Sequence, residues 1–365
     1  MPAISVLIKP ASGMCNMKCE YCFYVDEMKN RKQSNFGMMS EETLEHIISK
    51  TLAFAEEECN MAFQGGEPTL RGVSFFKKMI VFQKQYNQNN CAINNTIQTN
   101  GYNLTKEWCE FLKENNFLVG LSIDGVKYTH DIFRKANNGD ESYQKIRESV
   151  ALMNQYEVPY NILTVVHKRT APAIRKIYQN YKKNGFEYQQ YIACMEPFGE
   201  KRGETMYSLL PQVYGEFLKE LFDLWYIDYQ HGEQPCIRQF ENYIGILLGY
   251  ESEACEQRGH CSIQTVIEAD GSVYPCDFYA IDQYCMGNLN ENSLEEIYQS
   301  EAGIKFVKEG SDSDGTCRTC DYFMLCRGGC KRQKFQNEIT GMEENYFCRS
   351  YQMFFDHSIG RMKEI

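Results

Sequence analysis

The segment Cys15-Asn16-Met17-Lys18-Cys19-Glu20-Tyr21-Cys22 places three cysteines in a C-x3-C-x2-C pattern, shortly after a short apolar run at residues 4–8. Three thiolates at this spacing on one loop can ligate three irons of a 4Fe–4S cubane and leave the fourth iron without a protein ligand. Zinc sites usually have four ligands, and disulfide frameworks need an even number of cysteines. The segment therefore predicts an iron–sulfur cluster with one open iron rather than three unrelated cysteines.

This triplet, followed by Phe23, resembles the signature of the radical S-adenosylmethionine (SAM) enzymes. The resemblance implies that the amino and carboxylate groups of SAM chelate the open iron. It also implies that one electron from the cluster cleaves SAM into methionine and a 5′-deoxyadenosyl radical.

Length and composition indicate a globular protein with a sizeable core. The chain has 365 residues, of which 43% are apolar and 13% aromatic, as in ordered proteins. A net charge of −11 argues against a nucleic-acid partner, because phosphate binding needs a basic face. No apolar run approaches the roughly 20 residues needed to span a membrane, so no membrane association is expected.

Cysteine usage points to a reducing compartment. The chain has 17 cysteines, and residues 1–14 lack the basic and apolar regions of a signal peptide. Many cysteines without a secretion signal indicate metal ligation rather than disulfides. We therefore expect a cytoplasmic protein.

The first half of the chain alternates between strand and helix patterns. Each predicted strand is followed by a polar or glycine-rich turn, which is typical of repeated βα units and a parallel sheet. The six predicted strands cover residues 3–8, 60–64, 92–98, 118–123, 160–166 and 188–193. A closed barrel would need two more units, so we predict an α/β fold with a partial (β/α)6 barrel. The carboxyl ends of such strands carry the functional residues.

The pattern changes in the last third of the chain. A polar connector at 197–210 leads to two helical stretches, 211–230 and 236–248, and cysteines become dense after Cys255. Residues 265–274 read as a hairpin, and residues 293–296 form a capping box. We therefore predict two domains, residues 1–235 and residues 236–365.

A second motif supports SAM binding. Gly65-Gly66-Glu67-Pro68 follows the second predicted strand and resembles the GGE motif of radical SAM enzymes, which contacts the SAM amino group. Two glycines let the backbone approach a ligand, and a carboxylate neutralises an ammonium group. The resemblance further implies SAM contacts by Ser122 and Arg134 (ribose and carboxylate) and by Tyr21 and Met195 (adenine).

The C-terminal cysteines resemble the SPASM domain, which binds two auxiliary 4Fe–4S clusters in peptide-modifying radical SAM enzymes. The array is C-x2-C-x5-C-x3-C from Cys317 to Cys330, with further cysteines on both sides. The family pattern implies one cluster on Cys255, Cys261, Cys276 and Cys330, and a second on Cys317, Cys320, Cys326 and Cys348. Three 4Fe–4S clusters are then expected in total.

Two other interpretations of these cysteines stay open. Cys317, Cys320, Cys326 and Cys330 could form a four-sulfur zinc ribbon. The cysteines outside the array are interpreted as small buried hydrophobic residues, and Cys285 has no assigned role. The six are Cys59, Cys91, Cys109, Cys194, Cys236 and Cys285.

Within the SPASM group, the whole chain resembles the anaerobic sulfatase-maturating enzymes, as seen in Leu7–Ser12, Cys22–Tyr24 and Tyr274–Tyr279. The resemblance implies oxidation of a Cys or Ser residue in a sulfatase C/S-x-P-x-R motif to Cα-formylglycine. It aligns the general base with Asp277, next to Cys276. The implied partners are an unfolded or nascent sulfatase polypeptide and a flavodoxin- or ferredoxin-type electron donor.

Two alternatives compete with this function. A thioether-forming SPASM enzyme often has a precursor-binding domain of about 80 residues before the triplet, and only 14 residues precede Cys15. A non-enzymatic iron–sulfur carrier explains neither an open iron nor the GGE segment. The sequence therefore favours the maturase.

Overall fold

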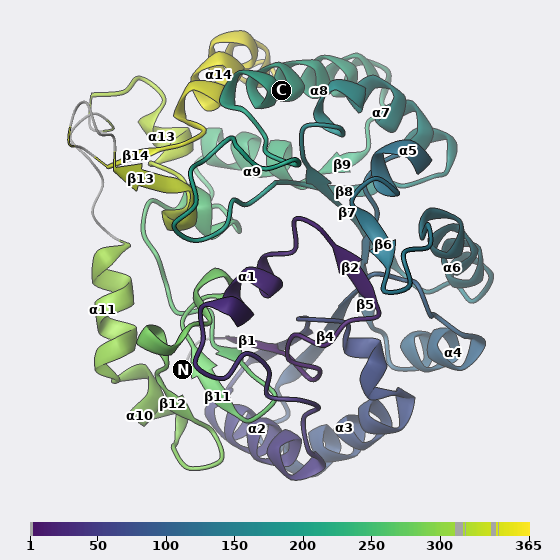
Figure 1. Ribbon diagram of the computed structural model, residues 1–365, viewed down its shortest axis with the longest axis vertical. Helices are drawn as coiled ribbons and strands as arrows, with labels where there is room; N and C mark the ends of the chain where they lie inside the picture. Colours follow the sequence, from purple (N-terminus) through teal and green to yellow (C-terminus); the bar gives the residue numbers. More distant parts are fainter. Residues whose placement is uncertain (1–2, 311–316, 318, 337–340, 342) are drawn as a thin grey trace. The chain divides into compact units, whose positions relative to one another are not determined.

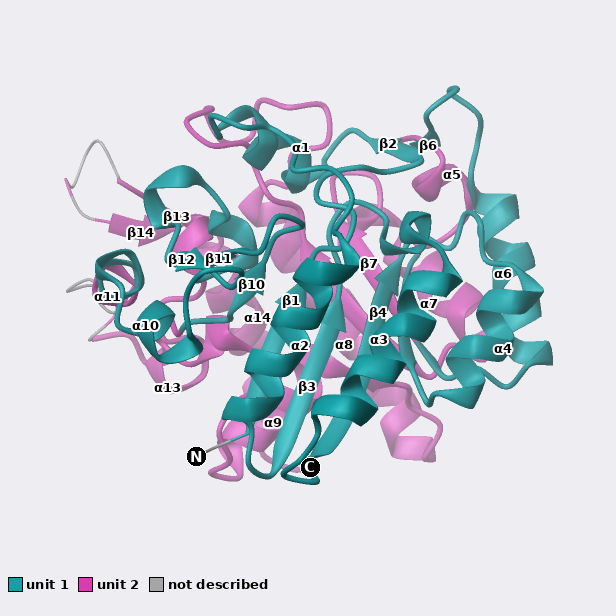
Figure 2. Cartoon of the chain, turned by 90° about the horizontal axis from the view of Figure 1, so that it is seen from below, with its two compact units in different colours: residues 1–122, 134–160, 263–306 teal, residues 123–133, 161–262, 307–365 magenta. Residues whose placement is uncertain are grey.

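The computed structural model describes residues 3–310, 317, 319–336, 341 and 343–365. These residues divide into two compact units that interleave along the chain (Figure 2). Unit 1 comprises residues 1–122, 134–160 and 263–306, and unit 2 comprises residues 123–133, 161–262 and 307–365. Among the described residues, no helix has both the length and the apolar character that crossing a membrane requires.

Unit 1 is built on seven strands in the order β12-β11-β10-β1-β3-β4-β5. The last four of these strands run parallel: β1 pairs β3, β3 pairs β4, and β4 pairs β5. In β1 every second residue is apolar and buried, and the buried residues of β4 include the polar Asn95 and Thr99 beside Ile97. The strands are β1 (Ile4–Ile8), β3 (Glu58–Phe63), β4 (Ala92–Thr99), β5 (Leu118–Ser122), β10 (Val266–Ile267), β11 (Ser272–Tyr274) and β12 (Gly287–Asn288).

Helices α2 (Glu41–Phe54) and α3 (Val73–Tyr86) cover one face of this sheet (Figure 2). Helix α2 begins where the Ser40 hydroxyl accepts a hydrogen bond from the Thr43 amide, 3.0 Å. The core beneath the helices is aromatic, with Phe63 of β3 and Phe76 of α3 in edge-to-face contact at 5.0 Å. The remaining helices of unit 1 are α1 (Phe23–Lys29), α4 (Lys106–Glu114), α6 (Tyr143–Gln155) and α10 (Leu294–Tyr298), with the 3₁₀ turns η1 (Pro68–Arg71), η4 (Asp277–Tyr279) and η5 (Asp282–Tyr284).

The predicted hairpin at residues 265–274 forms β10 and β11, which pair antiparallel. Strand β10 then adds to the edge of the sheet in parallel register with β1, matching Leu7 with Val266 and Ile8 with Ile267. The sequence did not indicate this pairing, because the two strands lie about 260 residues apart. The pairing places the residues that follow β11, including η4, in the same unit as the N-terminal strand.

Unit 2 contains the parallel strands β7 (Tyr160–Val166, whose first residue belongs to unit 1), β8 (Tyr188–Ala193) and β9 (Cys236–Ile237). Its core is formed by α8 (Pro211–His231), α9 (Arg238–Leu247) and α14 (Cys348–Met362), and Phe222 meets Phe354 at 6.0 Å. Figure 1 shows α8 and α14 side by side. The other elements are α5 (Lys127–His130), η2 (Ala171–Ala173), α7 (Ile174–Lys183), η3 (Cys255–Gln257), α13 (Phe323–Cys326), η6 (Lys331–Gln333), β13 (Lys334–Gln336) and β14 (Glu343–Asn345), while α11 (Glu301–Glu309) spans a boundary of the two units.

All six predicted βα strands are present within one or two residues of their predicted bounds. The predicted helices at 211–230 and 236–248 correspond to α8 and α9. One element that the sequence did not predict is the two-stranded ribbon of β2 (Met17–Cys19) and β6 (Arg134–Ala136). Three-residue strands are too short to show a periodic pattern, and this ribbon carries part of the cysteine triplet.

Candidate active site

The cysteine triplet lies on a loop that two backbone anchors hold. Cys19 ends β2, where it is paired with Arg134 of β6, and Cys22 precedes the first turn of α1. The Cys22 amide donates to the Cys19 carbonyl at 3.2 Å. The thiols are close enough to interact electrostatically, Cys15 with Cys19 and Cys22 with Cys15. The structure therefore brings the three predicted ligands together.

The chemistry of these thiols fits a metal cluster. Burial raises the pKa of Cys15 to about 11, and a hydrogen bond from the Met17 amide at 3.4 Å opposes the shift. Burial likewise raises the pKa of Cys22. Buried thiols with raised pKa values are protonated at neutral pH, and a metal that binds them must displace those protons. The donor set on this loop, three free thiols, is the set that an iron–sulfur cluster takes.

The Gly65–Glu67 segment packs directly against the residue that precedes the triplet. Both glycines have positive φ, and a Cβ on Gly66 would lie 2.2 Å from the Met14 carbonyl oxygen. A Cβ on Gly65 would lie 2.7 Å from the Lys9 side chain. The Glu67 amide donates to the Met14 carbonyl at 2.8 Å. Only glycines fit this approach to the cysteine loop.

The Glu67 carboxylate is buried and hydrogen-bonded by the chain itself. Its Oε1 accepts from the hydroxyls of Thr69 and Thr99, each at 2.7 Å, and from the Thr69 amide at 3.1 Å. Its Oε2 accepts from the Asn100 amide at 2.8 Å. Burial raises the pKa of Glu67, although these hydrogen bonds oppose the shift. Glu67 thus fixes the turn that follows β4, a role that the sequence did not indicate.

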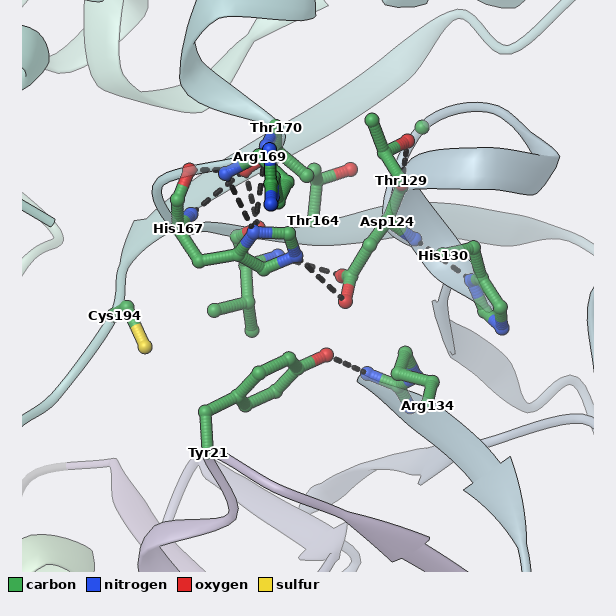
Figure 3. A network of polar contacts seen from close by, with 12 residues as sticks. Tyr21, Asp124, Thr129, His130, Arg134, Thr164, His167, Arg169, Thr170 and Cys194 are labelled. Carbon is green, nitrogen blue, oxygen red and sulfur yellow. Dashed lines mark hydrogen bonds and ion pairs between the residues drawn. The ribbon is translucent and has the colours of Figure 1, made fainter. Parts of the chain in front are cut away.

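The predicted adenine, ribose and carboxylate contacts lie in both units. Arg134 and Tyr21 meet in unit 1, where the guanidinium donates to the Tyr21 hydroxyl at 3.1 Å (Figure 3). Ser122 is buried at the end of β5 in the same unit. Met195 follows β8 and belongs to unit 2.

Figure 3 also shows a buried polar pair in unit 2, Asp124 and His167. Nε2 of His167 lies 3.9 Å from Asp124 Oδ2, and Asp124 Oδ1 accepts from the Val165 amide at 2.9 Å. His167 Nδ1 accepts from the amides of Arg169 and Thr170. These contacts hold the turn after β7, so we interpret the pair as structural.

Asp277 opens η4 directly after Cys276 and meets two residues of unit 1. Its Oδ2 accepts from the Tyr24 hydroxyl and from Gln64 Nε2, each at 2.8 Å. Its Oδ1 is buried and has no hydrogen-bond partner among the residues that the structure describes. Burial raises the pKa of Asp277, while the charge of Lys9 opposes the shift. One carboxylate oxygen is thus held in place, and the other is a buried acceptor that the described residues leave without a donor.

Lys9, whose charge acts on Asp277, belongs to a buried ion network that no sequence motif indicated. Lys9 lies 2.7 Å from Glu268 and 3.4 Å from Glu27, and its Nζ sits 4.6 Å from the centre of the Tyr24 ring. Arg31 contacts both carboxylates, at 2.6 and 3.3 Å. Glu27 accepts from the Ala280 amide at 3.1 Å, and Arg31 donates to the Ala280 carbonyl. A lysine within an otherwise apolar segment was the signal available in the sequence.

Four cysteines of unit 2 line a single cavity of about 230 Å³. They are Cys317, Cys320, Cys326 and Cys348, with Tyr322, Phe323, Tyr351 and Phe355 among the other lining residues. Four sulfurs at the 2.3 Å bond length of a zinc site leave no such space between them. In the described part of the chain, no group of three or more His, Cys, Asp or Glu side chains is placed closely enough to hold a single metal ion. These four cysteines are the set predicted for one auxiliary cluster, and Cys330, the fourth member of the zinc-ribbon alternative, is not among the lining residues.

The other predicted auxiliary ligands are divided between the units. In unit 2, Cys330 interacts electrostatically with Cys255 and Cys261, and burial raises its pKa to about 12. The Cys261 amide donates to the Gly310 carbonyl at 3.2 Å. Cys276 belongs to unit 1, at the start of η4.

Comparisons with known proteins give a consistent result. The model of the radical SAM superfamily matches residues 10–180, and the model of an iron–sulfur cluster-binding domain, SPASM, matches residues 255–321. A cysteine-type anaerobic sulfatase-maturating enzyme of Clostridium novyi (strain NT) is 44% identical over 362 residues, which cover 99% of this chain and 97% of the relative. A serine-type anaerobic sulfatase-maturating enzyme of Bacteroides thetaiotaomicron is 32% identical, covering 96% of this chain and 88% of the relative.

A solved structure agrees over the full length. Native anSMEcpe with bound AdoMet and Cp18Cys peptide superposes with a TM-score of 0.94 at 40% identity, covering 100% of this chain and 98% of that chain. AdoMet is another abbreviation for SAM.

Proposed function

Because this chain belongs to the cysteine-type anaerobic sulfatase-maturating enzymes of the radical SAM superfamily, we propose that it oxidises a cysteine in a sulfatase C-x-P-x-R segment to Cα-formylglycine. The substrate is then an unfolded or nascent sulfatase polypeptide, with serine as a second acceptable residue. The observation that carries the chemical proposal is the Asp277 carboxylate, with Oδ2 held by Tyr24 and Gln64 and Oδ1 buried beside them without a partner among the described residues.

We assign the SAM site to the residues that the sequence motifs predict. Cys15, Cys19 and Cys22 would hold the first 4Fe–4S cluster, whose open iron is available to SAM. The buried cation Arg134 suits a carboxylate group. Among the described residues, Glu67 Oε2 accepts a hydrogen bond from the Asn100 amide alone, so it retains capacity for an ammonium donor. The remaining SAM contacts are assigned to Gly65, Gly66, Tyr21, Ser122 and Met195.

When bound, SAM and the reduced cluster supply the radical that removes a hydrogen from the substrate Cβ, and the auxiliary clusters supply an electron acceptor. The substrate must also lose its thiol proton before a thioaldehyde can form, and hydrolysis then gives the aldehyde. We assign that proton to Asp277 Oδ1. Tyr24 and Gln64 orient the carboxylate by donating to the other oxygen.

We assign the auxiliary clusters to the predicted cysteine sets. Cys317, Cys320, Cys326 and Cys348 line a cavity of suitable chemistry, and Cys255, Cys261, Cys276 and Cys330 form the other set. Residues 1–235 then carry the SAM reaction and residues 236–365 the auxiliary clusters. A flavodoxin- or ferredoxin-type protein is the proposed electron donor. A cytoplasmic location suits the 17 cysteines.

The test is anaerobic incubation of the reconstituted protein with SAM, a reductant and a C-x-P-x-R peptide. Mass spectrometry should find formylglycine in place of the cysteine, with one 5′-deoxyadenosine per product. A matched peptide with alanine in place of cysteine serves as the control. A peptide that loses only two hydrogens and gains a thioether would instead identify a crosslinking enzyme. Absence of 5′-deoxyadenosine would contradict both functions.

A further inference from the structure

Two asparagine amides lie beside the Cys15 thiol. Asn100, in the turn after β4, places its Nδ2 3.5 Å from Cys15 Sγ and donates to Asn16 Oδ1 at 2.8 Å. The Met17 amide also donates to Cys15 Sγ, at 3.4 Å. Cys15 is therefore surrounded by N–H donors from two separate segments of unit 1.

The orientation of both amides follows from the hydrogen-bond network. Oδ1 of Asn100 accepts from the Tyr102 backbone amide at 2.8 Å, and a backbone N–H can only donate. Nδ2 of Asn100 must then point to Cys15 and Asn16. Because Asn16 receives that bond on its Oδ1, its own Nδ2 points away from Asn100. The Asn100 backbone is itself held by Glu67, whose Oε2 accepts from the Asn100 amide.

Nδ2 of Asn16 is a buried donor without an acceptor. The atom is enclosed, and no described residue accepts a hydrogen bond from it. Buried amide donors are normally satisfied, because leaving one unmade costs about 1–3 kcal/mol. The Oδ1 atom of the same amide lies 3.9 Å from Cys15 Sγ, so the unpaired Nδ2 is close to the cluster ligand. A cluster sulfide is an acceptor with the required negative charge.

We propose that Asn100 and Asn16 form a donor relay onto the sulfur atoms of the first cluster, with Asn100 donating to the Cys15 thiolate and Asn16 to a cluster sulfide. This inference rests on the proposed function, since it assumes a cluster on Cys15, Cys19 and Cys22. The relay raises the reduction potential of that cluster. Hydrogen bonds to the sulfurs stabilise the extra negative charge of the reduced state and so make reduction easier.

The test is an EPR-monitored redox titration of the reconstituted full-length protein without SAM. The signal of the first cluster is identified by its loss when Cys15, Cys19 and Cys22 are all replaced by alanine. Asn16→Leu should lower the ratio of reduced to oxidised cluster about tenfold at a fixed potential, a shift of about 59 mV for one electron. Asn100→Ala should lower this ratio further, because the substitution removes the Asn100 donor and also the hydrogen bond that orients the Asn16 amide.

Asn137 provides the matched control. Its Nδ2 donates to the Cys15 carbonyl at 2.8 Å and not to the sulfur, so Asn137→Leu and Asn137→Ala should leave the potential unchanged. All variants are compared at full iron content. If Asn16→Leu loses iron, Asn16→Ser replaces it and should shift the potential in the same direction.

Each outcome has a separate meaning. Unchanged potentials in both Asn16 and Asn100 variants overturn the relay while leaving the cluster intact. A shift that appears only after SAM is added would place the Asn16 acceptor on SAM and also overturn the assignment. If replacing the three cysteines removes no iron, the proposed function itself fails.

Discussion

The hydroxyl group of Tyr24 donates a 2.8 Å hydrogen bond to Oδ2 of Asp277, joining the first turn of α1 to the turn after β11. Gln64 Nε2 contacts both groups, at 2.7 Å from the Tyr24 hydroxyl and 2.8 Å from Asp277 Oδ2. The sheet makes this meeting possible, because β10 pairs with β1 and brings residue 277 beside the N-terminal strand. Two residues distant in sequence from Asp277 thus hold one of its carboxylate oxygens.

Tyr24→Phe should reduce formylglycine formation by about tenfold. The substitution removes one hydrogen bond to a carboxylate, which contributes about 1.5 kcal/mol or roughly a factor of ten in rate. The measurement is the rate of formylglycine formation with SAM and peptide in excess. Tyr226→Phe is a suitable control, since this tyrosine of unit 2 donates its hydroxyl hydrogen bond to Glu364, far from Asp277 in sequence. Equal rates for Tyr24→Phe and wild type would show that Gln64 alone orients Asp277.

The reconstituted protein should contain about twelve irons, four for each of three cubanes. Replacing Cys15, Cys19 and Cys22 by alanine should remove about a third of the iron and abolish SAM cleavage, since the open iron is lost. Cys285→Ala should change neither quantity, because Cys285 is exposed and belongs to none of the three sets. Metal analysis by mass spectrometry provides the measurement. Zinc in the C-terminal sites would contradict the assignment of auxiliary clusters.

Glu67→Ala should weaken SAM binding and leave the iron content intact. The carboxylate holds Thr99 and Asn100 as well as offering Oε2 to an ammonium group, so its loss disturbs the pocket wall and removes a charge. Binding of SAM to the reconstituted protein can be followed by equilibrium dialysis. Thr69→Val, which removes one donor to Glu67 but keeps its charge, should have a smaller effect. Iron loss with unchanged SAM affinity would instead make Glu67 purely structural.

Neutralising Glu268 should destabilise the protein more than neutralising Glu27. Burial raises the pKa of Glu27 to about 8 from an ordinary value of 4.5, although Lys9 and Arg31 oppose the shift. Burial acts in the same direction on Glu268, but Lys9 and Arg31 lower the pKa of Glu268 to about 2. Glu27→Gln resembles the protonated form of Glu27, so it should lower the free energy of unfolding by about 1 kcal/mol or less. Glu268→Gln leaves two buried cations, Lys9 and Arg31, without this charged partner, so it should lower the free energy of unfolding by about 3 kcal/mol.

The same pair predicts a pH dependence of stability. Between pH 4.5 and 8 the folded protein holds a proton on Glu27 that the unfolded chain releases. The stabilisation of the folded state by this proton is therefore fully present below pH 4.5 and is lost as the pH rises through 8. The contribution of Glu268 has the opposite sign and is lost only as the pH falls toward 2. Anaerobic melting of the holoprotein should therefore show a lower melting temperature at pH 9 than at pH 6. Glu27→Gln should flatten this slope, and an unchanged slope would contradict the raised pKa.

Much of the fold was predictable because its signals are local. Each βα strand is a short buried run followed by a polar turn, and the triplet carries its spacing within eight residues. The predicted fold class, a partial barrel of the radical SAM type followed by a SPASM domain, is confirmed by the comparisons. Long-range pairing was not predictable: neither the addition of β10 to β1 nor the β2–β6 ribbon leaves a periodic pattern.

Residues of the candidate site were predictable only where they belong to a recognisable sequence motif. Asp277 was found through its place after Cys276, but its partners Tyr24 and Gln64 are ordinary polar residues in the sequence. Lys9 gave one usable signal, a charge within an apolar segment, because a buried lysine needs a buried carboxylate. Asn16 and Asn100 gave no signal in the sequence, since the proposed role of each depends on the orientation of its side-chain amide in the folded chain.

Asp277→Asn should separate the two products of the reaction. The substitution keeps the shape of the side chain and removes the proton acceptor at Oδ1, while Tyr24 can still donate to the remaining oxygen. A general base is worth about 10²–10⁴-fold in rate, so formylglycine should fall by about a hundredfold or more. Removal of the Cβ hydrogen precedes loss of the thiol proton, so 5′-deoxyadenosine should still form, at a lower rate.

The informative quantity in this experiment is the ratio of formylglycine to 5′-deoxyadenosine, measured by mass spectrometry and chromatography on the same samples. A variant that merely misfolds loses both products together and leaves the ratio unchanged, and iron content and SAM binding report on that case directly. Asp282→Asn is the matched control, because Asp282 lies on the next turn of the same segment and accepts from the Lys32 amide; its ratio should equal that of wild type. If Asp277→Asn yields formylglycine and 5′-deoxyadenosine in the wild-type ratio, another group accepts the thiol proton and the assignment to Asp277 is wrong.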